Sequence, residues 1–202
     1  MTSLVVISAG LSQPSSTRLL ADKLSTAVVS ALGTPVEVTV LELRDLAHDI
    51  TNNLLTGFPP PALSAAVATV TAADALIAVT PIFSASYSGL FKSFFDVLDP
   101  DALDGKPVLI AATGGSARHS LALEHAVRPL FSYLRAVVVP TAVYAASEDW
   151  ASTGDGELAG RVTRAAGQLA ALVSGSPSSS TGSKDPFAQV IPFAEMLKAQ
   201  GR

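Results

Sequence analysis

The sequence contains no cysteine, which excludes disulfide bonds, thiol catalysis and thiolate metal ligands. Its histidines are few and lack the spacing of a metal site, so we expect no bound metal. Charge is also sparse, because 13 Lys and Arg against 17 Asp and Glu give a net charge of −4. That balance provides no basic surface for nucleic acid, which we therefore do not expect as a partner.

Long hydrophobic runs are missing too. The longest apolar stretch, 67–83, is interrupted by Asp74 and Pro81, so no transmembrane helix is predicted. The N-terminal apolar run is short and follows no basic region, which argues against a signal peptide. We therefore expect a cytoplasmic protein with no membrane partner. Apolar residues still make up 49% of the 202 positions, enough for one domain with a substantial core.

Short apolar runs rich in β-branched residues alternate with helical patterns along the chain. This alternation predicts an α/β fold in which helices cover both faces of a parallel sheet. The best match is a flavodoxin-like three-layer sandwich with five parallel strands in the order 2-1-3-4-5. Strands are expected at 4–8, 35–41, 75–80, 108–112 and from 137, and helices at 15–32, 46–55, 62–73, 88–98, 120–134 and 157–173.

The composition changes near the C-terminus. One domain is expected over 1–173, followed by a Ser-rich linker at 174–186 and an apolar tail at 187–202. A disordered tail would be polar throughout, but this one has large apolar side chains. We therefore expect the tail to dock on a surface, either across a subunit interface or on another protein.

A strand, a Ser-rich loop and a helix start follow one another in residues 4–18, LVVISAGLSQPSSTR. A helix start has unpaired N–H groups and partial positive charge, and nearby hydroxyls add donors. The segment therefore predicts a phosphate cradle, although an ordinary Ser/Thr helix cap is the alternative. The patterns of P-loop ATPases and Rossmann dinucleotide folds are absent. The candidate residues are Ser8, Gly10, Ser12, Ser15, Ser16 and Thr17.

Two more loops follow predicted strands at the same edge of the sheet. In parallel sheets, ligands bind beyond the carboxyl ends of the strands. The loops at 81–88 and 113–119 are rich in Gly, Ser, Thr or Pro, as loops in general are. Together with the first loop they predict one shared site. Its further candidates are Pro81, Ile82, Phe83, Ser84, Ala85, Ser86, Thr113, Gly114, Gly115 and Ser116.

Residues 3–173 resemble the NAD(P)H-dependent FMN reductases of flavodoxin-like fold. The segment 8–18 is similar to the family's phosphate loop, and 113–116 is similar to its glycine turn. The most specific match is 80–92, TPIFSASYSGLFK, which is similar to the family's P-x-Y-N-x-S-x-P-G-x-L-K. The tail sequence PFAEML resembles an actinobacterial branch that serves flavin-dependent monooxygenases.

The resemblance implies FMN as cofactor, NADPH or NADH as hydride donor, and no catalytic acid, base or nucleophile. Residues 81–87 would form a wall for the flavin ring, although Phe83 and Tyr87 could equally be core or interface aromatics. Backbone N–H groups of 113–116 would meet the polar edge of the ring. Gly114 and Gly115 permit the positive φ of an anion-binding nest, although an ordinary turn is the alternative.

Three positions depart from the family pattern. Ser12 stands where the family usually has Arg. The start of the first helix, the nearby hydroxyl groups and Arg18 would therefore meet the phosphate charge. Ser84 and Ser88 replace the family's Asn and Pro. These changes bear on flavin contacts rather than on the predicted fold.

The sequence thus predicts an NAD(P)H:FMN oxidoreductase that could supply reduced FMN to a flavin-dependent monooxygenase. Aromatics in the wall loop and at 91–95 also suggest a homodimer or homotetramer. The alternatives are a flavodoxin-type electron carrier, a quinone, azo or metal-oxyanion reductase with tightly bound FMN, and a flavin-fold interaction module.

Overall fold

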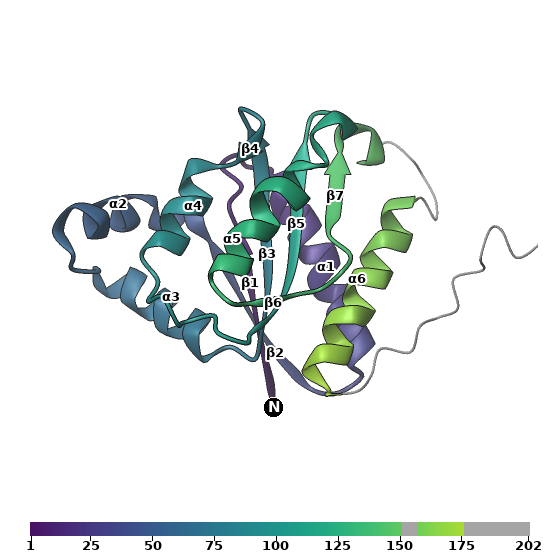
Figure 1. Cartoon of the computed structure of the whole chain (residues 1–202), viewed down its shortest axis with the longest axis horizontal. Coiled ribbons are helices and arrows are strands. Elements are labelled where there is room, and N and C mark those ends of the chain that lie inside the picture. Colours follow the sequence, from purple (N-terminus) through teal and green to yellow (C-terminus); the bar gives the residue numbers. More distant parts are fainter. Residues whose placement is uncertain (151–156, 176–202) are drawn as a thin grey trace, which may run out of the picture.

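The computed structural model describes residues 1–150 and 157–175. Its strands form one sheet in the order β2-β1-β3-β5-β6, in which every neighbouring pair is parallel (Figure 1). This is the flavodoxin-like order that the sequence predicts. The strands are β1 (Thr2–Ser8), β2 (Val36–Glu42), β3 (Ala75–Phe83), β4 (Ser86–Tyr87), β5 (Pro107–Gly114), β6 (Val137–Val138) and β7 (Val143–Ala146).

Within the described residues, the sheet has seven strands rather than the predicted five. The fifth position is divided, because β6 and β7 both pair in parallel with β5 and a segment containing Pro140 separates them. Proline has no N–H for a strand ladder. Arg128 instead donates to the carbonyls of Val139 and Pro140, at 3.1 and 3.0 Å. The other addition is β4, which pairs antiparallel with the end of β3.

Helices cover both faces of the sheet (Figure 1). The helices α1 and α6 pack on one face, where they meet alternate residues of the strands such as Leu4 and Val6. The helices α2 to α5 cover the other face over Val5 and Ile7. The helical segments are α1 (Ser16–Leu32), η1 (Leu43–Leu46), α2 (Ala47–Thr56), α3 (Pro61–Ala72), α4 (Gly89–Asp96), η2 (Ala117–His119), η3 (Leu123–Val127), α5 (Arg128–Tyr133), η4 (Ser147–Trp150) and α6 (Glu157–Val173).

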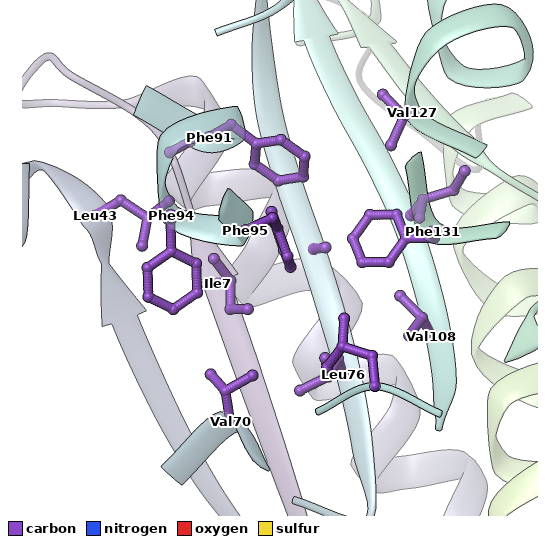
Figure 2. Packing of buried hydrophobic residues seen from close by; sticks show 14 of the residues in the cluster. Ile7, Leu43, Val70, Leu76, Phe91, Phe94, Phe95, Val108, Val127 and Phe131 are labelled. Atoms are coloured by element: carbon purple, nitrogen blue, oxygen red, sulfur yellow. The ribbon is translucent and has the colours of Figure 1, made fainter. Parts of the chain in front are cut away.

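Aromatic side chains fill the core beneath α4 and α5. Phe91, Phe95 and Phe131 are buried in contact, with ring centroids 4.8 Å apart for the first pair and 4.9 Å for Phe95 and Phe131 (Figure 2). Phe94 is buried beside them. The prediction that the aromatics of 91–95 indicate a subunit interface is therefore wrong, since these rings stabilise the monomer. Burying one such ring contributes about 1.5–3 kcal/mol.

The last described helix ends where the sequence predicts. Helix α6 ends at Val173, and Leu158, Val162 and Leu169 face the core as its periodicity requires. Most of the expected linker and the whole apolar tail lie outside the described residues. Across 1–150 and 157–175, no single helix is long and apolar enough to span a membrane. Only Leu43–Thr56 and Pro61–Ala72 taken together reach that length, and they meet at 93°.

Candidate functional site

The three predicted loops meet at one edge of the sheet. They follow β1, β3 and β5, which are neighbours at its centre. Ser8 is paired with Val79 and Pro81 with Thr113, so these strands end at similar heights. In Figure 1 this edge lies at the top, near the β4 hairpin and opposite the N-terminus. Every predicted site residue therefore belongs to a single region of the molecule.

The first loop closes tightly onto the start of α1. Ser15 is the N-cap, and its Oγ accepts a hydrogen bond from the Arg18 N–H at 3.2 Å. Gly10 is buried, and a Cβ there would overlap Ser15 Oγ, so a larger residue would displace the Ser15 hydroxyl from its capping position. Ser8 Oγ is also buried, and it has no hydrogen-bond partner among the described residues. Ser15 therefore caps helix α1. The Ser8 hydroxyl is buried and could still form a hydrogen bond to a ligand.

Thr17 connects the first loop to the third. Its hydroxyl lies 2.8 Å from the hydroxyl of Thr113, and both residues are buried. Thr17 therefore faces the protein interior, whereas Ser12 and Ser16 are exposed at the edge.

The second loop is a two-residue hairpin between β3 and β4. Ser84 and Ala85 form its turn with φ of 47° and 68°, a region that favours glycine or asparagine. Thr80 stabilises the base of the hairpin, since its Oγ1 accepts a hydrogen bond from the Ser88 N–H at 3.1 Å. Phe83 is 48% exposed. Tyr87 instead packs 5.9 Å from the ring of Phe91 and extends the core, so Phe83 is the aromatic of this loop that is open to a ligand.

The third loop contradicts one expectation. Neither Gly114 nor Gly115 has a positive φ, so the predicted nest does not form at these glycines. Gly114 is required for a different reason, since a Cβ would overlap Tyr144 Oη and lie 3.1 Å from Cζ. Tyr144 Oη donates to the Ser116 carbonyl at 2.9 Å and so supports the loop from below.

The sequence did not indicate Tyr144, because it stands in a short apolar strand with no motif around it. Burial, followed by the nearby carboxylates of Glu148 and Asp149, raises the pKa of this phenol. Tyr144 therefore remains a neutral donor throughout the physiological range.

Two arginines flank the first loop, and both are paired. Arg18 contacts Asp22 and Glu42 at 2.8 and 2.7 Å, so its guanidinium is directed to carboxylates. The hydrogen bond to Asp22 is the main cause that raises the Arg18 pKa above its ordinary value. Arg44 follows β2 and contacts the loop itself. The adjacency of β2 and β1 in the predicted order could have indicated Arg44.

This fold and this edge define a flavodoxin-like α/β protein with a ligand site built from loops after β1, β3 and β5. The family model described as NADPH-dependent FMN reductase matches residues 2–151, and the chain belongs to this family. It is an oxidoreductase of the NAD(P)H-dependent FMN reductase type, as the resemblance implied.

Relatives with assigned activities are similar over most of their length. The FMN reductase (NADPH) of Pseudomonas aeruginosa is 39% identical over 146 residues, which cover 72% of this chain and 77% of the relative. The NADH-dependent FMN reductase SfnF of Pseudomonas fluorescens is 41% identical over 147 residues, covering 73% and 78%.

Solved structures of oxidoreductases are also similar to this chain. An oxidoreductase from Corynebacterium diphtheriae has 50% identity and a TM-score of 0.84, covering 88% of this chain and 99% of that one. The apo form of the NADH:FMN oxidoreductase EMOB has 32% identity and a TM-score of 0.76, covering 88% and 93%. A flavodoxin-like WrbA-like protein from Agrobacterium tumefaciens, at 17% identity and TM-score 0.60, supports the fold alone.

Proposed function

We propose that the edge formed by 8–17, 81–86 and 113–116 is where NADPH or NADH reduces FMN in this protein. The observation that carries the proposal is the hydrogen bond between Thr17 and Thr113, which joins the helix start to the third loop. A phosphate cradle and a surface for a flat ring are thereby parts of one rigid unit.

The residues of this edge fit the two ends of FMN. Gly10 keeps the first loop close to the start of α1, where N–H groups and positive dipole favour a phosphate. The buried Ser8 Oγ and the exposed hydroxyls of Ser12 and Ser16 are further donors. Ile82 and Phe83 supply apolar surface for the ring, and Pro81 is buried next to them in the chain.

The protein supplies orientation rather than a reacting side chain. Bound FMN would supply the hydride-accepting ring for the nicotinamide, a chemistry that requires no acid, base or nucleophile from the protein. The neutral Tyr144 holds the Ser116 carbonyl, so the backbone of the third loop is set in place before the ligand arrives. Such preorganised backbone groups stabilise developing charge without reorganising.

We also propose a cytoplasmic homodimer or homotetramer that supplies reduced FMN to a flavin-dependent monooxygenase. A groove of about 440 Å³ next to the β3–β4 hairpin supports a subunit interface at this face. Tyr87, His125, Leu130 and Tyr133 line it, and Tyr133 is 84% exposed. Association through this face would bring a second copy close to the flavin edge.

The test is to titrate purified protein with FMN and then add NADPH or NADH without oxygen. We expect the bound flavin to bleach, whereas a flavodoxin-type carrier would bind FMN and stay oxidised. Ser15→Glu adds a negative charge at the helix start and should weaken FMN binding by about 1–3 kcal/mol. Ser30→Glu adds the same charge at the far end of α1 and is the control. Equal FMN affinities of the two variants would remove the first loop from the site.

A further inference from the structure

Arg44 contacts the first loop from outside the predicted site. It lies in η1, directly after β2, and its side chain is only 18% exposed. Nη1 donates toward the backbone carbonyl of Ser12 at 3.4 Å. With the Gln13 amide oxygen turned to the guanidinium, that oxygen accepts from Nη1 at 2.9 Å and also from Nη2. One side chain therefore holds two consecutive residues of the loop.

The guanidinium is itself held in place by carboxylates. Glu42 Oε2 lies 3.2 Å from Arg44 Nη2, and Asp45 Oδ1 lies 3.5 Å from Nε. Glu42 ends β2 and is paired in register with Ser8, the residue before the first loop begins. The other Glu42 oxygen binds Arg18 at 2.7 Å. This arrangement fixes Arg44 relative to the sheet, so its contacts fix the loop relative to the sheet as well.

We infer that Arg44 is a positioning residue for the phosphate end of FMN, an inference that rests on the proposed function. Arg44 acts through Ser12 and Gln13 by keeping their half of the loop folded against the start of α1. The N–H groups and hydroxyls of the cradle are then arranged before the phosphate arrives, and the cost of ordering them does not reduce the affinity.

The planar shape of arginine is essential to this role. Its planar fork donates to a backbone carbonyl and a side-chain amide while it forms ion pairs with two carboxylates, whereas an ammonium is a single point of charge. Lysine at this position would keep the charge and lose the geometry. The inference therefore predicts that Arg44→Lys behaves like a neutral replacement.

The experiment measures FMN and riboflavin binding by flavin fluorescence, with no nicotinamide nucleotide present. Riboflavin has the same ring and no phosphate. For Arg44→Gln we expect FMN binding to weaken about tenfold while riboflavin binding changes by less than about twofold. In steady state, the KM for FMN should rise similarly and kcat at saturating FMN should not change. Amide hydrogen exchange of residues 10–15 should also accelerate in the flavin-free variant.

Lys23→Gln is the charge control, because it removes one positive charge from the exposed surface of α1 and leaves the contacts of Ser12, Gln13 and Glu42 in place. FMN binding should then change by less than about twofold. Gln13→Ala removes one loop contact at constant charge and should weaken FMN binding by about threefold, which tests the inference even if Arg44 variants fold poorly.

Three results would overturn the inference: unchanged FMN binding in Arg44→Gln and Gln13→Ala, equal weakening in Lys23→Gln and Arg44→Gln, or equal weakening of FMN and riboflavin. The second result would indicate long-range charge rather than loop geometry. If the wild-type protein binds no FMN, the proposed function itself is contradicted. Tight wild-type binding with insensitive variants contradicts only the role of Arg44.

Discussion

Thr17 and Thr113 share a buried hydrogen bond of 2.8 Å, although 96 positions separate them in the chain. Thr17 belongs to the first turn of α1, and Thr113 lies near the end of β5. The phosphate end and the ring end of the candidate site are therefore linked through the interior rather than across the surface. Removing one of these hydroxyls should therefore alter both the phosphate end and the ring end of the candidate site.

The first prediction is a double-mutant cycle on this pair. Thr113→Val leaves the Thr17 hydroxyl buried without a partner and should lower the free energy of unfolding by about 1–3 kcal/mol. Thr17→Val should do the same. The double variant replaces both partners with apolar groups of similar shape and should recover much of the loss. Urea denaturation measures all four proteins, and strictly additive losses would show that the hydroxyls are not coupled.

The second prediction distinguishes two neighbouring glycines. Gly114→Ala forces its methyl group against Tyr144 Oη, so stability and FMN affinity should both fall. Gly115→Ala is the control, because a Cβ there meets nothing within 4 Å and its φ is not positive. Adding Tyr144→Phe to Gly114→Ala should restore part of the stability. Thermal melting would contradict the packing account if both alanine variants melted alike.

The third prediction concerns the hairpin turn. Ser84 and Ala85 hold φ of 47° and 68° without being glycine or asparagine. Such backbone conformations cost about 1–3 kcal/mol each. The double variant Ser84→Asn, Ala85→Gly matches the residues that this turn prefers and should raise the free energy of unfolding by about 1 kcal/mol or more. Chemical denaturation measures it, and lower stability of the variant would mean that the turn is not strained.

The fourth prediction is a pH dependence from Tyr144. Its pKa is raised in the folded protein, mainly by burial, so the unfolded chain loses the phenolic proton first. The stabilisation is complete below the unfolded value of about 10 and is lost as the pH rises above it. Urea midpoints of the wild type should therefore fall more steeply than those of Tyr144→Phe between pH 9 and 11, values chosen to bracket that pKa. Parallel curves would contradict the shift.

The fifth prediction concerns the C-terminal tail, which lies outside the described residues. Deleting 175–202 leaves α6 whole, because that helix ends at Val173. If the tail packs across the subunit interface, the deletion should lower the melting temperature or dissociate the oligomer, as light scattering would show. Unchanged mass, stability and FMN kinetics would favour instead a docking peptide for a monooxygenase.

Much of the fold was predictable because its signals are local. The apolar periodicity of α6 gave its bounds, and the strand that precedes each loop fixed the edge on which that loop lies. The divided fifth strand was not predictable, since a side chain of the preceding helix, Arg128, replaces part of its ladder and no sequence pattern shows this contact. The aromatics of 91–95 could not be assigned either, because an apolar stripe does not reveal what covers it.

The sequence by itself determined the alternation of strands and helices, the three polar loops and the family to which they belong. How each candidate site residue packs depends on the tertiary structure. Gly114 is needed for the space that Tyr144 occupies, Thr17 faces inward to Thr113, and Arg44 reaches the first loop from the next strand. The physical reason is that periodicity and turn composition act between near neighbours in the chain. Steric fit and hydrogen-bond pairing depend instead on which distant residues the folded sheet brings together.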